Sequence, residues 1–313
     1  MKLNYIYQGN CLEVLKSFED KCINCCVTSP PYYGLRDYGV EGQIGNEDTP
    51  FDYVDKLVDI FAEVRRVLKD DGTLWLNLGD SWAGSSQGTG TKHPTPKQAS
   101  NHGTNYMTTE HHVSKLKHVE GCKPKDLIGI PWMVAFSLRE SGWYLRQDII
   151  WAKGNPMPES VKDRCTKSHE YIFLLSKSRK YYYDYHAIKE PATTKPTKRD
   201  KHKEGYQADY TKGDRFSSGE RVYGSDGMRN KRDVWNVNTK PCKEAHFATF
   251  PDTLIEPCIL AGCPDGGIVL DPFMGAGTTG MVAKKHGRNY VGIELNKEYI
   301  DIANKRIEEY MKK

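Results

Sequence analysis

The sequence has no long hydrophobic run, and the mean hydropathy of its 313 residues is −0.68. A membrane-spanning helix needs about 20 mostly apolar residues in a row, so we expect no contact with a membrane. The opening residues, Met1 to Tyr5, lack the apolar core of a secretory signal. These features favour a cytoplasmic protein.

A disulfide framework is also missing. The nine cysteines are odd in number and have no regular spacing, which is typical of a reducing compartment. Cys22 and Cys25 have no second pair nearby, so we expect neither a zinc site nor a redox centre there. Five of the ten histidines lie between Ala83 and His118 without cysteine partners. We therefore predict no metal site.

The excess of positive charge is small, because 45 Lys/Arg face 41 Asp/Glu and the formal net charge is only +4. Its distribution is more informative. The stretch from Glu190 to Arg232 holds eleven Lys/Arg and seven Asp/Glu, while the rest of the chain holds 34 of each. The whole surplus therefore lies in one segment, which is where a polyanionic partner would bind.

Short β-prone runs alternate with runs of helical periodicity, which predicts an α/β fold with a parallel sheet covered by helices. The segment from Ala83 to His118, rich in Gly, Ser, Thr and Asn, interrupts this rhythm and is expected to be a long surface loop. The expected strands are 3–8, 23–28, 73–78, 143–151, 171–176, 268–270 and 290–294, with 181–185 as a further candidate. The expected helices are 11–18, 54–68, 126–140, 253–260, 280–286 and 298–310.

A glycine-rich turn near the C-terminus indicates a nucleoside-type cofactor. Gly275 to Gly280 reads GAGTTG, follows an expected strand, opens an expected helix, and precedes Glu294 by about 20 residues. The turn begins with Asp271-Pro272-Phe273, whose carboxylate would repel a pyrophosphate and suit a cofactor with an ammonium group, such as S-adenosylmethionine. Only 33 residues follow Gly280, so the rest of the sheet must precede the motif. A nicotinamide-dependent oxidoreductase therefore remains only a remote alternative.

A second candidate site lies at the other end of the chain. Thr28 to Tyr32 reads TSPPY and follows an expected strand, and open α/β sheets bind ligands at the carboxyl ends of their strands. Two adjacent prolines make this turn rigid. A purely structural turn is the alternative, but the aromatic residue and the permuted glycine motif favour a catalytic site.

These motifs resemble those of DNA amino-methyltransferases of the β arrangement, in which the catalytic motif comes first and the cofactor motif last. Ser29 to Tyr32 matches their S/D-P-P-Y tetrad, and Asp271 to Thr278 matches their D-P-F-x-G-x-G-T motif. The block from Trp151 to Ser160, continued by His169-Glu170-Tyr171, is similar to an internal block of the family. Phe247 to Pro251 is similar to the block before the cofactor motif.

The resemblance implies a circularly permuted, Rossmann-like methyltransferase sheet, mostly parallel, with helices on both faces and one reversed strand near an edge. It assigns 1–189 to the catalytic half, including the loop at 83–118. It assigns 190–240 to a target-recognition insert and 241–313 to the cofactor-binding half.

The resemblance further implies S-adenosylmethionine as the cofactor and double-stranded DNA as the partner. The implied cofactor residues are Asp271, Pro272, Phe273, Gly275, Gly277, Thr278, Glu294, Thr249 and Phe250, together with Asn10, where many relatives have aspartate. A cognate restriction endonuclease is a possible further partner, and the oligomeric state stays open.

The catalytic residues are expected to be Ser29, Pro30, Pro31 and Tyr32. The Ser29 hydroxyl and the Pro30 carbonyl would accept the amino hydrogens of a flipped base, and Tyr32 would stack on it. No cysteine nucleophile is required, so Cys25 and Cys26 are expected to be small buried strand residues. In the family that the sequence resembles, serine at the first position of the tetrad goes mostly with cytosine N4 and aspartate mostly with adenine N6. The resemblance therefore implies cytosine N4 as the target, with adenine N6 as the alternative.

The basic stretch interleaves its cations with tyrosines and a phenylalanine, which suits contact with phosphates and base edges. A flexible solvated loop is the alternative interpretation. A non-catalytic DNA-binding module and an RNA methyltransferase are further alternatives. The candidate DNA-binding residues are Lys198, Arg199, Lys201, Arg215, Arg221, Arg229, Lys231 and Arg232.

Overall fold

The computed structural model describes residues 1–35, 42–84, 119–192, 227–240 and 249–312, and the backbone of two short strands at 197–198 and 222–223. The chain forms two compact units. The larger unit contains Met1–Asp184 and Asp233–Lys313, and the smaller contains Tyr185–Arg232. The predicted loop at 83–118 lies outside the described residues apart from Ala83 and Gly84.

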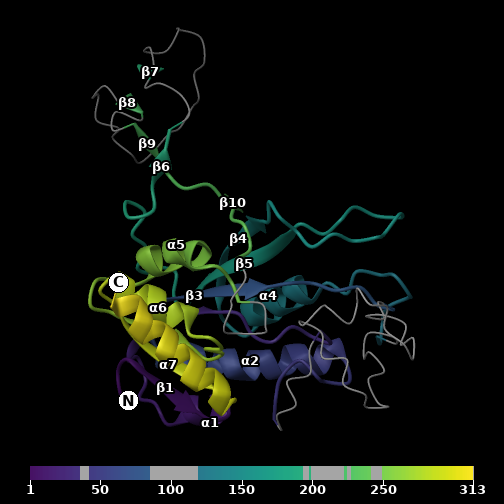
Figure 1. The fold of residues 1–313 in the computed structure, drawn as a ribbon, viewed down its shortest axis with the longest axis horizontal. Helices are drawn as coiled ribbons and strands as arrows, with labels where there is room; N and C mark the ends of the chain where they lie inside the picture. The colour runs from purple at the N-terminus through teal and green to yellow at the C-terminus, as the bar shows by residue number, and fades with distance from the viewer. Residues whose placement is uncertain are drawn as a thin grey trace, which may run out of the picture. The chain divides into compact units, whose positions relative to one another are not determined.

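The larger unit is built on an eight-stranded sheet with the order β1-β12-β11-β2-β3-β5-β4-β10 (Figure 1). All neighbouring strands are parallel except at β5, which runs antiparallel to both β3 and β4. The predicted reversed strand is therefore β5, the third strand from one edge. The strands are β1 (Tyr5–Gln8), β2 (Ile23–Thr28), β3 (Leu68–Leu78), β4 (Tyr144–Ala152), β5 (His169–Ser176), β10 (Val234–Asn236), β11 (Ile268–Asp271) and β12 (Asn289–Glu294).

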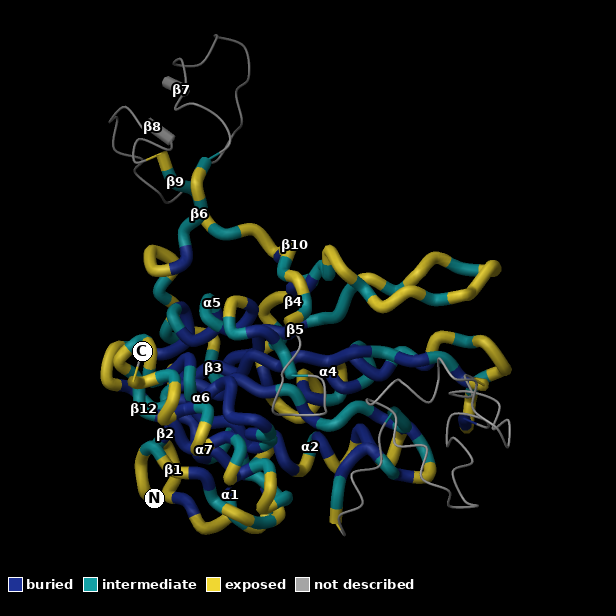
Figure 2. The backbone as a smooth tube through the Cα atoms, viewed as in Figure 1, coloured by how far each residue is buried: buried dark blue, intermediate teal, exposed yellow. Residues whose placement is uncertain are grey.

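Helices cover both faces of this sheet, as expected. One set packs together as α1 (Cys11–Lys16), α2 (Pro50–Val67) and α4 (Ile130–Glu140). The other set is α5 (Asp252–Gly262), α6 (Thr278–Lys285) and α7 (Lys297–Met311). The central strands are buried between the two sets (Figure 2). Cys25 and Cys26 are both fully buried in β2, which confirms their expected role as small strand residues.

The strand order shows how the two ends of the chain form one sheet. N-terminal β1 pairs with β12, with Tyr5 opposite Val291. In the centre, β11 pairs with β2, with Val269 opposite Cys25. The carboxyl ends of β2 and β11 are therefore adjacent although they are more than 240 residues apart in sequence. This brings the Ser-Pro-Pro-Tyr turn beside the glycine turn.

Several expectations about secondary structure were wrong, among them the start of the strand expected at 73–78, which begins at Leu68. Residues 181–185 are not a strand, and the Tyr183 ring there stacks on Trp75. The helix expected at 126–140 begins at Ile130, because Gly129 caps it with a φ of +86° that other residues rarely adopt. The helix expected at 54–68 begins at Pro50, ends at Val67 and passes directly into β3.

The boundaries of the expected insert also differ from those of the smaller unit. Residues 234–236 belong to the main sheet as β10, where Trp235 lies opposite Trp151 of β4. The smaller unit therefore ends at Arg232 rather than at position 240. Within it, β6 (Glu190–Pro191) pairs with β9 (Met228–Arg229), and β7 (Thr197–Lys198) pairs with β8 (Val222–Tyr223).

Candidate functional site

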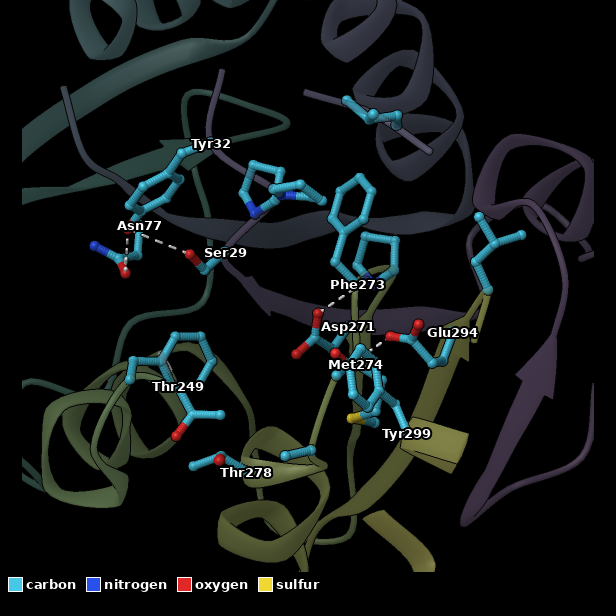
Figure 3. A pocket seen from close by; sticks show the side chains of 18 of the residues that line it. Ser29, Tyr32, Asn77, Thr249, Asp271, Phe273, Met274, Thr278, Glu294 and Tyr299 are labelled. Carbon is cyan, nitrogen blue, oxygen red and sulfur yellow. Dashed lines mark hydrogen bonds between the residues drawn. The ribbon is translucent and has the colours of Figure 1, made fainter. Parts of the chain in front are cut away.

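A pocket of about 450 Å³ lies at the carboxyl ends of β2, β3, β11 and β12 (Figure 3). It brings together all the predicted catalytic and cofactor residues except Gly277. The predicted residues that line it are Asn10, Ser29, Pro30, Pro31, Tyr32, Thr249, Phe250, Asp271, Pro272, Phe273, Gly275, Thr278 and Glu294.

The Ser-Pro-Pro-Tyr turn is anchored by the elements around it. The Tyr53 hydroxyl, on α2, donates a hydrogen bond of 2.8 Å to the Pro31 carbonyl. A side chain at Gly79 would lie 2.6 Å from Cε2 of Tyr32, so a glycine just after β3 makes room for the tyrosine ring. The turn therefore holds Ser29 and Tyr32 in defined positions.

A polar network surrounds the Tyr32 hydroxyl. This hydroxyl lies 2.8 Å from Oε2 of Glu170 and 3.2 Å from Oδ1 of Asn77. The Ser29 hydroxyl lies 3.5 Å from the Tyr32 oxygen. Burial, followed by the nearby Glu170 carboxylate, raises the pKa of Tyr32 well above its ordinary value, so the phenol keeps its proton.

Glu170 is held from its other side by a cation. Lys153 Nζ forms an ion pair with Oε1 of Glu170, and the side chains are 19% and 14% exposed. The same ammonium lies 4.4 Å from the centre of the Trp151 ring, a cation–π contact. All three residues line the pocket.

The glycine turn depends on two positions where a side chain does not fit. Gly277 has a φ of +78° and caps α6, and a Cβ there would lie 2.8 Å from the Cβ of Ala303. At Gly292 of β12, a Cβ would lie 2.3 Å from Cε of Met274. The turn can therefore approach β12 and α7 closely. Gly277 supports the pocket wall without lining it.

Asp271 lies at the centre of this wall and is only 1% exposed. Its Oδ1 accepts hydrogen bonds from the Thr28 hydroxyl at 2.6 Å and the Phe273 amide at 3.0 Å, and its Oδ2 accepts one from the Thr279 hydroxyl at 2.6 Å. Its oxygens therefore join β2, β11 and α6. Burial raises the pKa of this carboxyl to about 6, although the hydrogen bonds from Thr279 and Thr28 counteract the rise.

This raised pKa predicts a specific pH dependence. Between the ordinary value of 3.8 and about 6, the folded protein holds a proton that the unfolded chain has lost. Asp271 therefore destabilises the fold as the pH rises through this window, by on the order of 2–3 kcal/mol. Asp271→Asn, which cannot ionise, should gain stability relative to the native protein between pH 4 and pH 6. Urea unfolding of both proteins across this range measures the difference, and a difference independent of pH would contradict the raised pKa.

Glu294 ends β12 and faces the same pocket. Its Oε2 accepts a hydrogen bond from the Gly275 amide at 2.8 Å, and its Oε1 accepts one from the Asn296 amide at 2.9 Å. The Leu295 amide also hydrogen-bonds to this carboxylate. A carboxylate has about four acceptor positions, so acceptor capacity remains for a ligand hydroxyl. The side-chain oxygen of Asn10 caps α1 by accepting from the Leu12 amide at 3.0 Å.

The candidate DNA-binding residues lie in the smaller unit, and only part of them is described. Arg229 and Arg232 donate to the same oxygen of Glu190, at 2.9 and 3.0 Å. Lys231 lies between them in the sequence and is half-buried. Lys198 belongs to β7. Four others, Arg199, Lys201, Arg215 and Arg221, lie outside the described residues.

Sequence reasoning assigned no role to several residues of the pocket. Asn77 is a polar residue in the apolar second half of β3, close to the strand's carboxyl end. A polar residue at that position could have indicated a role in the site. Lys153 and Glu170 lie in the block that resembles the family, but nothing in their spacing indicates that they pair. Tyr299 lies on α7 and reaches the pocket only through tertiary packing.

The described part of the chain has neither a metal-binding cluster nor a membrane-spanning helix. No group of three or more His, Cys, Asp or Glu side chains there is arranged to hold a metal ion. Among these same residues, no helix has the length and apolar character needed to cross a membrane.

Comparison with known proteins gives consistent matches over nearly the whole chain. A family model of N6/N4 enzymes, described as DNA methylase, matches residues 23–305. The Type II methyltransferase M.Cfr9I of Citrobacter freundii is 47% identical over 97% of this chain and 87% of its own length. M.SmaI of Serratia marcescens is 48% identical over 96% of this chain and 90% of its own length.

Solved structures show the same fold. The cytosine-N4-specific PvuII DNA methyltransferase superposes with a TM-score of 0.63 at 18% identity, over 99% of this chain and 93% of that chain. A putative DNA modification methylase of Thermus thermophilus, complexed with S-adenosyl-L-methionine, superposes with a TM-score of 0.57 at 23% identity, over 97% and 95% of the two chains. The expected Rossmann-like methyltransferase sheet is thus confirmed.

Proposed function

Because the chain belongs to the N6/N4 DNA methylase family, we propose that it transfers a methyl group to the exocyclic N4 of a cytosine in duplex DNA. The observation that carries this proposal is the position of Ser29. It directly follows the central strand β2, lines the pocket beside the glycine turn, and is followed by the rigid Pro30-Pro31 pair. Serine at this position favours cytosine, and the PvuII enzyme of the same fold is cytosine-N4-specific.

The expected cofactor, S-adenosylmethionine, is confirmed by the family. The pocket fits it, because Glu294 keeps acceptor positions for ribose hydroxyls and the half-buried Phe273 offers an aromatic surface. Asn10 and Thr278 line the same pocket. Asp271, whose oxygens are already bonded to two threonines, acts in our proposal by holding the turn rather than by meeting the cofactor's ammonium. When bound, the cofactor supplies a methyl group on a positively charged sulfur.

The target amine is a poor nucleophile, because its lone pair is delocalised into the ring. In our proposal, residues of this chain make the amine more nucleophilic. The Ser29 hydroxyl and the Pro30 carbonyl accept the two amino hydrogens, which frees the nitrogen lone pair for attack. Acceptors already in place also stabilise the positive charge that develops on this nitrogen. The Tyr32 ring stacks on the base, which is worth about 1–3 kcal/mol.

The basic smaller unit is proposed to contact the DNA target. Replacing Lys198, Arg199 and Lys201 by glutamine should weaken DNA binding and lower the slope of log K against log salt by up to about 3, since each lost phosphate contact removes about 0.9. Binding titrations at several salt concentrations measure the slope. Lys297, Lys305 and Lys312, on or beside α7, provide the matched control when changed to glutamine. An unchanged slope in the first variant would argue against this role.

We further propose that the protein works together with a restriction endonuclease that cuts the same DNA site, because the similar relatives are Type II methyltransferases. We propose the cytoplasm as the location, because the substrate is DNA and the cysteines described in the structure are free thiols.

Adenine N6 remains the second candidate, because the matching family includes N6 enzymes.

A first test of the nucleic-acid substrate supplies labelled S-adenosylmethionine with mixed-sequence DNA or with RNA of similar composition. We expect label in DNA with the native protein, and none above background in RNA. Preferential labelling of RNA would contradict the proposed substrate.

A further inference from the structure

Serine and aspartate differ as acceptors for the amino group. A carboxylate only accepts hydrogen bonds, whereas a serine hydroxyl has one hydrogen and two lone pairs. If the Ser29 hydrogen pointed toward the base, it would oppose the amino hydrogens. The hydroxyl therefore needs another group to take its hydrogen.

The structure provides such a group in the Tyr32 oxygen, 3.5 Å from the Ser29 hydroxyl. For Tyr32 to accept this hydrogen, its own hydrogen must point elsewhere. Glu170 takes it, since Oε2 of this carboxylate lies 2.8 Å away, closer than the 3.2 Å to the Asn77 oxygen. Hydrogen bonds to charged acceptors are also the stronger ones.

Glu170 is itself fixed in this role. Its Oε2 also accepts from the Asn77 amide at 3.3 Å, and Oε1 is paired with Lys153. Asn77 is further held by donating 3.0 Å to the Tyr171 carbonyl of β5. The Lys153 ammonium keeps the low-exposure carboxylate compensated, which a buried charge requires.

We propose that Glu170 is a positioning residue for methyl transfer. By accepting the Tyr32 hydrogen, it orients the two hydroxyl groups so that Ser29 presents its lone pairs to the target amine. This inference rests on the role proposed for Ser29 but not on the identity of the base. Glu170 acts through Tyr32 and does not touch the reacting atoms.

The test is a double-mutant cycle with Glu170→Gln and Tyr32→Phe, because Phe keeps the ring and removes the hydroxyl. Each single variant should lower the single-turnover rate of methyl transfer by on the order of tenfold, with both substrates saturating. The double variant should be within about twofold of the slower single variant, since both changes break the same chain. S-adenosylmethionine should bind all three variants as it binds the native protein.

A multiplicative loss in the double variant, or an unchanged rate in Glu170→Gln, would overturn the inference. Glu170→Gln leaves Lys153 without its counterion, so the cycle is repeated with Lys153→Gln/Glu170→Gln, which contains no uncompensated charge. Glu256→Gln is the control, because this carboxylate pairs with Lys285 outside the pocket. Retained transfer in Ser29→Ala would instead refute the role of Ser29, so the two failures are distinguishable.

Discussion

Ser29→Ala should lose methyl transfer by on the order of 100- to 1,000-fold while still binding S-adenosylmethionine. The substitution removes one of the two acceptors that free the lone pair of the target amine, and removing a preorganised group of this kind costs about that much. The backbone of the turn should persist, because Tyr53 holds the Pro31 carbonyl and the Pro30 carbonyl is unchanged.

The measurement is the single-turnover rate with labelled cofactor, together with a direct titration of cofactor binding. Ser137→Ala, on α4 and outside the pocket lining, is a matched control and should transfer at the native rate. A Ser29→Ala variant that transfers within a few-fold of the native rate would remove Ser29 from the chemistry.

Glu294→Gln should have the opposite pattern of defects. We expect S-adenosylmethionine to bind on the order of 10- to 100-fold more weakly, since hydrogen bonds to a charged carboxylate are worth about 1.5–3 kcal/mol. The amide replaces one acceptor oxygen by a donor, which also opposes one of the two backbone amides, of Gly275 and Asn296, that donate to Glu294 in the native protein. With saturating cofactor, the transfer rate should recover to near the native value.

Calorimetric titration measures the affinity for the cofactor, and the dependence of the rate on cofactor concentration gives the transfer rate at saturation. Glu308→Gln, a carboxylate on α7 outside the pocket lining, should leave both quantities unchanged. If Glu294→Gln bound the cofactor normally, the proposed ribose contact would be wrong.

Local sequence patterns predicted much of the fold and the two halves of the site. The β-prone run at 23–28 and the glycine turn after 268–270 both have local signatures, and the order of the motifs predicted a permuted sheet. The structure places their ends side by side through the pairing of Val269 with Cys25. Residues 181–185 misled the strand prediction, because tyrosines have high β propensity wherever they occur, and Tyr183 here packs against Trp75.

Contacts between distant residues could not be predicted in this way. Asp271 bonds to Thr28 across 243 positions, and Tyr32 bonds to Glu170 across 138. No periodicity or spacing encodes such pairs, since they depend on which strands become neighbours. From the sequence we expected the Asp271 carboxylate to suit the ammonium group of the cofactor, whereas in the structure its oxygens join three elements.

The most direct test of the proposed function is the identity of the methylated nucleoside. DNA of mixed sequence is incubated with the protein and deuterated-methyl S-adenosylmethionine, digested to nucleosides, and separated by chromatography coupled to mass spectrometry. Authentic standards distinguish N4-methyldeoxycytidine from its isomer 5-methyldeoxycytidine and from N6-methyldeoxyadenosine. We predict label in N4-methyldeoxycytidine, lost in Ser29→Ala. Label in N6-methyldeoxyadenosine would contradict the choice of base, and label in 5-methyldeoxycytidine would contradict amino methylation itself.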